Sequence, residues 1–182
     1  MGVLSNLQPE RVFYYFEEIC KIPHGSFHTD AISDYCMSFA RSHGLRARQD
    51  ASGNVVIWKD AAPGYDNGDT VILQGHLDMV CVKEDGCLLD LEKDGLRLVV
   101  EGDNVYAEGT SLGGDDGIAV AYALAILEDD TIPHPALEVV LTVNEEVGML
   151  GATALDASDL KGRILLNLDS EDEGYFLTGC AG

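Results

Sequence analysis

The sequence contains few basic residues. Eleven lysines and arginines stand against 32 aspartates and glutamates in 182 residues, which gives a formal net charge of −21. Such a surface repels the phosphates of nucleic acids and of anionic lipids, so we expect neither nucleic acid nor a membrane as a partner. The acidic excess is compatible with cation binding, although charge alone does not identify a site.

Disulfide motifs and long apolar stretches are also missing. The five cysteines are odd in number and no pair has CxxC spacing, a pattern that favours reduced, mostly structural thiols. No stretch approaches the roughly 20 apolar residues that span a bilayer. The first 13 residues lack the basic region and apolar run of a secretory signal. These features predict a cytoplasmic protein.

The pattern of apolar residues predicts an α/β fold. Apolar residues recur at helical spacing in three segments, and β-branched runs bordered by turn residues form several others. We expect helices at 8–21, 31–43 and 115–129, and strands at 54–59, 70–78, 136–146, 163–171 and 174–178, with two short strands within 96–109. This order favours a mixed, largely parallel sheet flanked by helices.

A histidine and an aspartate lie at the end of one predicted strand, in the stretch VILQGHLDMV. Side chains two residues apart share a face of a strand, so His76 and Asp78 point the same way. Ligands bind at this end of strands in open α/β sheets. A histidine that binds metal through one ring nitrogen commonly has the other oriented by a carboxylate. The alternative is a buried ion pair without a ligand.

Three further acidic clusters follow apolar or glycine-rich segments. Asp115 and Asp116 come after two glycines in SLGGDDGIA, at the start of the long helix. Glu145 and Glu146 end the apolar stretch of LTVNEEVGM, and Asp169 ends that of LLNLDSEDEG. Each cluster has an alternative explanation. The aspartates before the helix could cap it, the two glutamates could be solvated acids at a strand end, and Asp169 could be a turn residue.

If the strands are neighbours, these clusters meet in one cleft. Carboxylates that lie close together repel one another unless a cation lies between them. Imidazole and carboxylate ligands suit zinc, or manganese and cobalt. One aspartate can bridge two ions about 3.5–4 Å apart, which lowers the pKa of water, and a further glutamate can act as general base. The residues therefore predict metal-assisted hydrolysis.

The sequence resembles the co-catalytic zinc metallopeptidases, which include aminoacylases, carboxypeptidase G and dipeptidases, and most closely those that act on aminoacyl-histidine dipeptides. The resemblance covers essentially the whole chain. Five motifs carry it in the family's order: IPHGSFHTDAISDY, QGHLDMV, GTSLGGDDGIAVA, HPALEVVLTVNEEVGMLGA and LLNLDSEDEG. Five separated motifs in register are far more specific than the single histidine–aspartate pair.

The resemblance implies a site for two divalent metal ions, zinc in the first place. His76 would bind one ion, with Asp169 completing the site around it. Asp115 would bridge both ions and Glu146 would bind the second. It also implies a cis peptide bond between Asp115 and Asp116.

The resemblance further implies the catalytic roles and the reaction. Asp78 would orient His76, and Glu145 would be the general base that takes a proton from the attacking water and passes it to the leaving amine. The reaction would be hydrolysis of small peptides, with Xaa-His dipeptides as the implied substrates.

Family members are much longer than this chain. The resemblance implies that residues 1–182 form the N-terminal portion of a zinc-peptidase-like catalytic domain that is incomplete at its C-terminus. The lid or dimerisation domain and a returning C-terminal segment with a final histidine ligand would be absent, and the full-length form would be a homodimer. His24, His28 and His134 match no ligand position, and we interpret them as structural or surface residues.

Two other functions compete with the peptidase. The chain could be a catalytically silent fragment that holds one ion through His76, Asp115 and Asp169. A magnesium-dependent phosphoesterase is the second, but the net charge and the lack of a basic phosphate-binding loop count against it. The histidine also favours zinc over magnesium, which prefers oxygen ligands.

Overall fold

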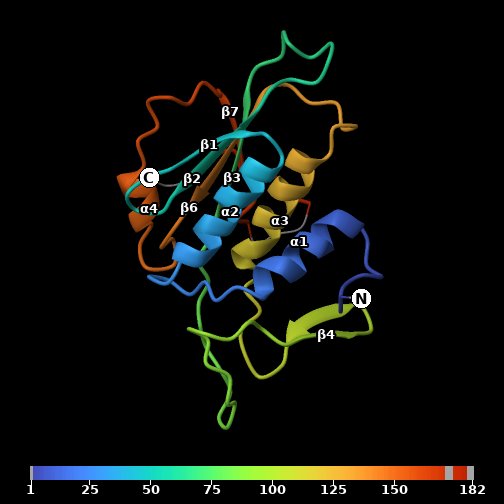
Figure 1. The fold of residues 1–182 in the computed structure, drawn as a ribbon, viewed down its shortest axis with the longest axis vertical. Coiled ribbons are helices and arrows are strands. Elements are labelled where there is room, and N and C mark those ends of the chain that lie inside the picture. Colours follow the sequence, from blue (N-terminus) through green and yellow to red (C-terminus); the bar gives the residue numbers. More distant parts are fainter. Residues whose placement is uncertain (1, 171–173, 180–182) are drawn as a thin grey trace.

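A five-stranded mixed sheet forms the centre of the structure, a computed structural model that describes residues 2–170 and 174–179 (Figure 1). Helices α1, α2 and α3 lie along one face of this sheet, and the separate hairpin β4–β5 lies beyond its edge (Figure 1). The helices are α1 (Glu10–Cys20), α2 (Asp30–Ser42), α3 (Gly114–Glu128) and α4 (Leu150–Ala154). The strands are β1 (Arg46–Gln49), β2 (Val55–Lys59), β3 (Val71–His76), β4 (Leu98–Glu101), β5 (Asn104–Ala107), β6 (Leu137–Thr142) and β7 (Ile164–Asn167).

The strand order is β1-β2-β6-β3-β7, and it brings the ends of three strands together at one end of the sheet. Strands β1, β2 and β6 pair antiparallel, whereas β3 runs parallel to both β6 and β7. The register sets His76 beside Thr142, and Gln74 beside Asn167. The C-terminal ends of β6, β3 and β7 therefore meet. The predicted mixed α/β fold is confirmed, although only half of these pairings are parallel.

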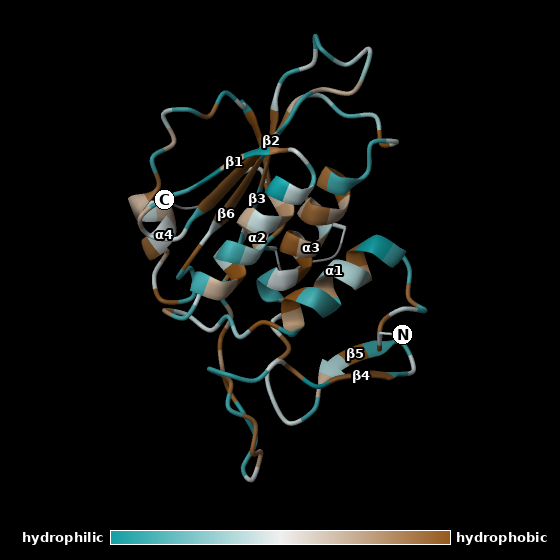
Figure 2. Ribbon diagram, viewed as in Figure 1, coloured by the Kyte–Doolittle hydropathy of each residue, from teal (hydrophilic) through white to brown (hydrophobic). Residues whose placement is uncertain are grey.

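Alternating side chains divide the sheet into a thickly covered face and a thinly covered one. Val139 and Leu141 of β6 pack into the main core with the helices, while Val140 belongs to a small cluster on the other face. Figure 2 shows the central strands as mostly hydrophobic, and the helices as mixed in hydropathy. Helix α3 lies in this core, where Val120 and Leu124 are fully buried, which accounts for its almost continuous apolar sequence.

The structure corrects several of the expected boundaries. The strand expected at 136–146 ends at Thr142, and that expected at 163–171 ends at Asn167; residue 171 lies outside the described residues. Residues 174–178 form no strand. Strand β1 and helix α4 were not predicted. Both are short, and β1 reads RARQ, so its conformation depends on pairing with β2 and not on its own apolar pattern.

Two further expectations concern disulfide bonds and membrane-spanning helices. Among the described cysteines, Cys20, Cys36, Cys81 and Cys87 form no disulfide, and Cys180 lies outside the described residues. In the part of the chain that the structure describes, none of the helices has the length and apolar character required to span a membrane.

Candidate metal centre

His76 ends β3 and is almost completely buried, with 1% of its surface exposed. Its Nδ1 lies 2.8 Å from the backbone oxygen of Asp78 and 3.6 Å from the Asp78 carboxylate. Its Nε2 lies 3.0 Å from Asp115 Oδ1 and 3.9 Å from Glu145 Oε2. One ring nitrogen is thus fixed by the protein, while the other is directed at the acidic side chains. This is the arrangement of a histidine that binds metal through Nε2.

Asp78 connects His76 to the segment after β6. Its carboxylate accepts hydrogen bonds from the Ser26 hydroxyl at 2.7 Å and from the amides of Glu145 and Glu146 at 2.9 and 3.3 Å. Burial by itself raises the pKa of Asp78, but His76, the Glu145 amide and the Ser26 hydroxyl together lower this pKa to about 2. Asp78 is therefore charged at neutral pH and holds both His76 and Glu145 in place.

The two aspartates at the start of α3, Asp115 and Asp116, lie in different surroundings. Their backbones are non-helical and the peptide bond between them is cis, as the resemblance implied. Asp115 has 68% of its side chain exposed, whereas Asp116 is 2% exposed and accepts a hydrogen bond from the backbone amide of His76 at 3.1 Å. A Cβ on Gly75 would lie 2.7 Å from the Asp116 carboxylate, so glycine is needed for this approach.

Four carboxylates lie close to the His76 ring. Ligand atoms of His76, Asp115 and Glu146 lie within 4.8 Å of one another, and so do those of His76, Glu145 and Asp169. The two groups share only His76. Glu145 and Asp169 therefore lie close enough to the histidine to share an ion with it, as Asp115 and Glu146 do.

The electrostatics of this centre favour a cation. Burial lowers the pKa of His76, but Asp78 and Asp116 outweigh this effect and raise the pKa to about 9. Burial, together with the neighbouring carboxylate of Asp115, raises the pKa of Glu146. Among the ion pairs of residues 2–170 and 174–179, the centre's carboxylates pair with His76 and with no lysine or arginine. A histidine and several uncompensated carboxylates are a donor set that fits zinc or another divalent ion.

All six residues expected at the site come together. They are His76, Asp78, Asp115, Glu145, Glu146 and Asp169. Sequence reasoning missed two supporting residues, Ser26 and Asp116. Burial raises the pKa of Asp116 to about 7, and the neighbouring carboxylates add to this effect, whereas His76 opposes it. The adjacent acids in SLGGDDGIA were the only signal for Asp116, and nothing in the sequence indicated which of them turns inward.

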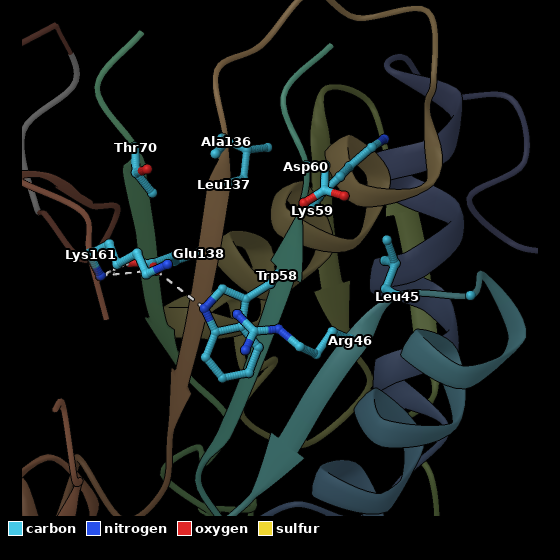
Figure 3. Close-up of a pocket in the computed structure, with 11 residues that line it drawn as sticks. Leu45, Arg46, Trp58, Lys59, Asp60, Thr70, Ala136, Leu137, Glu138 and Lys161 are labelled. Carbon is cyan, nitrogen blue, oxygen red and sulfur yellow. Dashed lines mark hydrogen bonds between the residues drawn. The ribbon is translucent and has the colours of Figure 1, made fainter. Parts of the chain in front are cut away.

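A cavity of about 370 Å³ lies at the other end of the strands from the metal centre (Figure 3). The buried Glu138 carboxylate accepts hydrogen bonds there from the Trp58 indole at 3.2 Å, from the Lys161 amide at 2.9 and 3.0 Å, and from the Gly162 amide at 2.9 Å. The Arg46 guanidinium stacks on Trp58 at 3.9 Å (Figure 3). Hydrogen bonds from three donors make Glu138 a structural carboxylate.

Comparison with known proteins gives two similar dipeptidases. The chain is 43% identical over 182 residues to the cytosol non-specific dipeptidase of Escherichia coli (strain K12), covering 100% of this chain and 38% of that protein. It is 44% identical to the crystal structure of aminoacylhistidine dipeptidase from Vibrio alginolyticus, with a TM-score of 0.91 over 94% of this chain and 35% of that one. The predicted resemblance to dipeptidases is confirmed.

Other comparisons bear on the fold of this dipeptidase-like chain. A Bacillus subtilis protein described as a dinuclear metal-binding peptidase of the M20 family matches with a TM-score of 0.58 at 14% identity, over 90% of this chain and 43% of that one. This match shows a shared fold. No protein-family model matches the sequence. The chain spans 38% and 35% of the lengths of the two dipeptidases.

Proposed function

We propose that this chain carries the metal centre of a metal-dependent dipeptidase. The observation that carries the proposal is the convergence of four carboxylates on His76, in two groups whose ligand atoms lie within 4.8 Å of one another. The similarity to two dipeptidases supports it. The name of the Bacillus subtilis neighbour supports a centre for two ions.

In this proposal the metal ligands are His76, Asp115, Glu146 and Asp169. His76 and Asp169 would hold one ion and Glu146 the other, and Asp115 would be a ligand shared by both. Two divalent ions, most simply zinc, would polarise the peptide carbonyl and lower the pKa of the attacking water. Cobalt and manganese suit the same ligands.

The protein's own groups would orient the centre and move the proton. Glu145 is the proposed general base: it takes a proton from the attacking water and delivers it to the amine of the leaving amino acid. Asp78 is the positioning residue for this step. Its carboxylate accepts a hydrogen bond from the Glu145 amide, and its backbone oxygen faces His76 Nδ1. One buried residue, through its backbone oxygen and its carboxylate, thereby fixes a metal ligand relative to the base.

The proposed substrates are dipeptides, with Xaa-His dipeptides among them. The names of the relatives support this range, since one is called non-specific and the other aminoacylhistidine dipeptidase. The cytosol in the first name supports the predicted cytoplasmic location. The place of residues 1–182 in a longer catalytic domain, and a homodimeric full-length form, stay predictions.

Exchange of Glu145 for glutamine tests the proposed function. With zinc bound, we expect Glu145→Gln to lower the rate of dipeptide hydrolysis by about 10²–10⁴-fold without loss of zinc, because the base is removed. Release of free histidine from Ala-His, measured by chromatography, gives the rate. Glu101→Gln, on the exposed hairpin strand β4, is the control and should retain full activity. A zinc-loaded parent chain that hydrolyses no dipeptide would instead support the catalytically silent fragment.

A further inference from the structure

A cavity of about 440 Å³ adjoins the candidate metal centre. Glu146, a proposed metal ligand, forms part of its wall, and so does Ser26, whose hydroxyl donates a hydrogen bond to Asp78. The rest of the lining is mainly apolar and includes one further carboxylate, Glu92. A molecule bound at the metal centre therefore has this cavity beside it, and the volume is within the range of pockets that bind small molecules.

Hydrogen bonds within the protein hold the walls of this cavity in place. The Met79 amide donates to the backbone oxygen of His24 at 3.1 Å, which joins the segment after β3 to the loop around Ser26. The Phe27 amide donates to the side chain of Asn144 at 2.6 Å, which joins the same loop to the segment after β6. The cavity is thus built in part from the ends of β3 and β6, which also carry residues of the metal centre.

The lining combines apolar side chains with negative charge. Met79, Val80, Leu91 and Val147 supply the apolar surface. Two carboxylates, from Glu92 and Glu146, line the cavity, and among the described residues no lysine or arginine does. His28 Nε2 lies 3.8 Å from the Glu92 carboxylate. A cavity with this lining favours uncharged or positively charged groups and disfavours anions.

We propose that this cavity receives one side chain of the dipeptide, accepts apolar or positively charged side chains, and rejects acidic ones. Glu92 sets the charge preference, because it is the carboxylate of the wall that has no place among the proposed metal ligands. This inference rests on the proposed function, since it takes the metal centre as the position of the peptide bond.

Charge reversal at Glu92 tests the preference. The measurement is kcat/KM for Ala-Leu, Ala-Lys and Ala-Asp and for the reversed dipeptides, which also identifies the side chain that enters the cavity. We expect Glu92→Lys to raise the ratio of acidic to basic substrate by roughly tenfold, because a partly screened charge is inverted. Glu101→Lys changes the net charge equally outside the cavity and should leave the ratio unchanged.

Alkylation of Cys81 tests occupancy without requiring turnover. Cys81 lines the cavity and is exposed, whereas Cys87 lines a different cavity and provides an internal reference. On zinc-loaded protein, Ala-Leu or Leu-Ala should slow the reaction of Cys81 with N-ethylmaleimide, while Cys87 reacts at an unchanged rate. Ala-Asp and Asp-Ala should protect Cys81 less. Mass spectrometry of the two cysteine peptides gives both rates.

The two experiments distinguish failure of the subsite from failure of the proposed function. Protection of Cys81 without hydrolysis of any dipeptide would contradict the dipeptidase activity and support the subsite. Hydrolysis without protection, and with an unchanged acidic-to-basic ratio in Glu92→Lys, would overturn the subsite and leave the activity standing. Neither protection nor hydrolysis would overturn both.

Discussion

The two ends of strand β6 carry glutamates in contrasting surroundings. Near its start, Glu138 is buried and receives hydrogen bonds from an indole and two backbone amides. Just beyond its end, Glu145 and Glu146 face other carboxylates around a single histidine. A buried acid whose hydrogen bonds all come from the protein stabilises the fold. Acids gathered around one imidazole require a cation from outside.

The stability of the protein should respond in opposite ways to the loss of a carboxylate at the two ends of β6. At the Glu138 end, loss of the acid leaves buried donors without an acceptor, which costs free energy of unfolding. At the Glu146 end, loss of one acid relieves repulsion in the metal-free protein but removes a ligand. Metal removal should therefore affect variants at one end only.

The largest effect is expected for Glu138→Ala. The free energy of unfolding should fall by about 3 kcal/mol, because the Trp58 indole and the amides of Lys161 and Gly162 lose their buried acceptor. Urea denaturation in zinc and in EDTA should give the same loss. Glu101→Ala, exposed on β4, is the control. A loss below about 1 kcal/mol would contradict the structural role of Glu138.

A smaller effect of opposite sign is expected for Glu146→Gln. In EDTA this variant should be more stable than the parent by about 0.5 kcal/mol, because one of several repelling charges is gone. In zinc it should be less stable than the parent, because it binds the ion more weakly. The same urea titrations measure both. Destabilisation in EDTA would show that Glu146 is held by favourable contacts, as Glu138 is.

The smallest effect is expected for Asp159→Asn, on the surface. Asp159 forms two 2.8 Å contacts with Arg48, and this hydrogen-bonded pair lowers the pKa of Asp159. A carboxylate with a lowered folded-state pKa stabilises the protein above its ordinary pKa near 4 and loses that effect as the pH falls further. The variant should lose less than about 1 kcal/mol at pH 7, and this loss should shrink as the pH falls below about 4. A loss that persists at low pH would rule out the ion pair as its cause.

The sequence predicted the elements that have long, regular apolar patterns. Helix α3 and strands β3 and β6 are buried along most of their length, so their residues follow the core directly. Strand β1 and helix α4 depend on contacts with distant segments, such as the stacking of Arg46 on Trp58. Such contacts leave no periodic signal in the chain.

The candidate site was predictable because its residues follow strands whose order in space could be inferred. His76, Glu145 and Asp169 each follow an apolar strand, and the parallel pairing of β6, β3 and β7 brings them together. The direction of Asp116 was not predictable. It depends on a non-helical backbone at the start of α3 and on the space that Gly75 leaves beside it, which only the folded chain reveals.

The most direct test of the account is the zinc content of this chain and of His76→Ala, determined by elemental analysis after dialysis against trace zinc. A metal centre built on His76 predicts one or two zinc ions per parent chain and none in the variant, with Glu138→Gln retaining the parent's zinc content. Equal zinc in the parent and in His76→Ala, or no zinc in either, would contradict a metal centre built on His76.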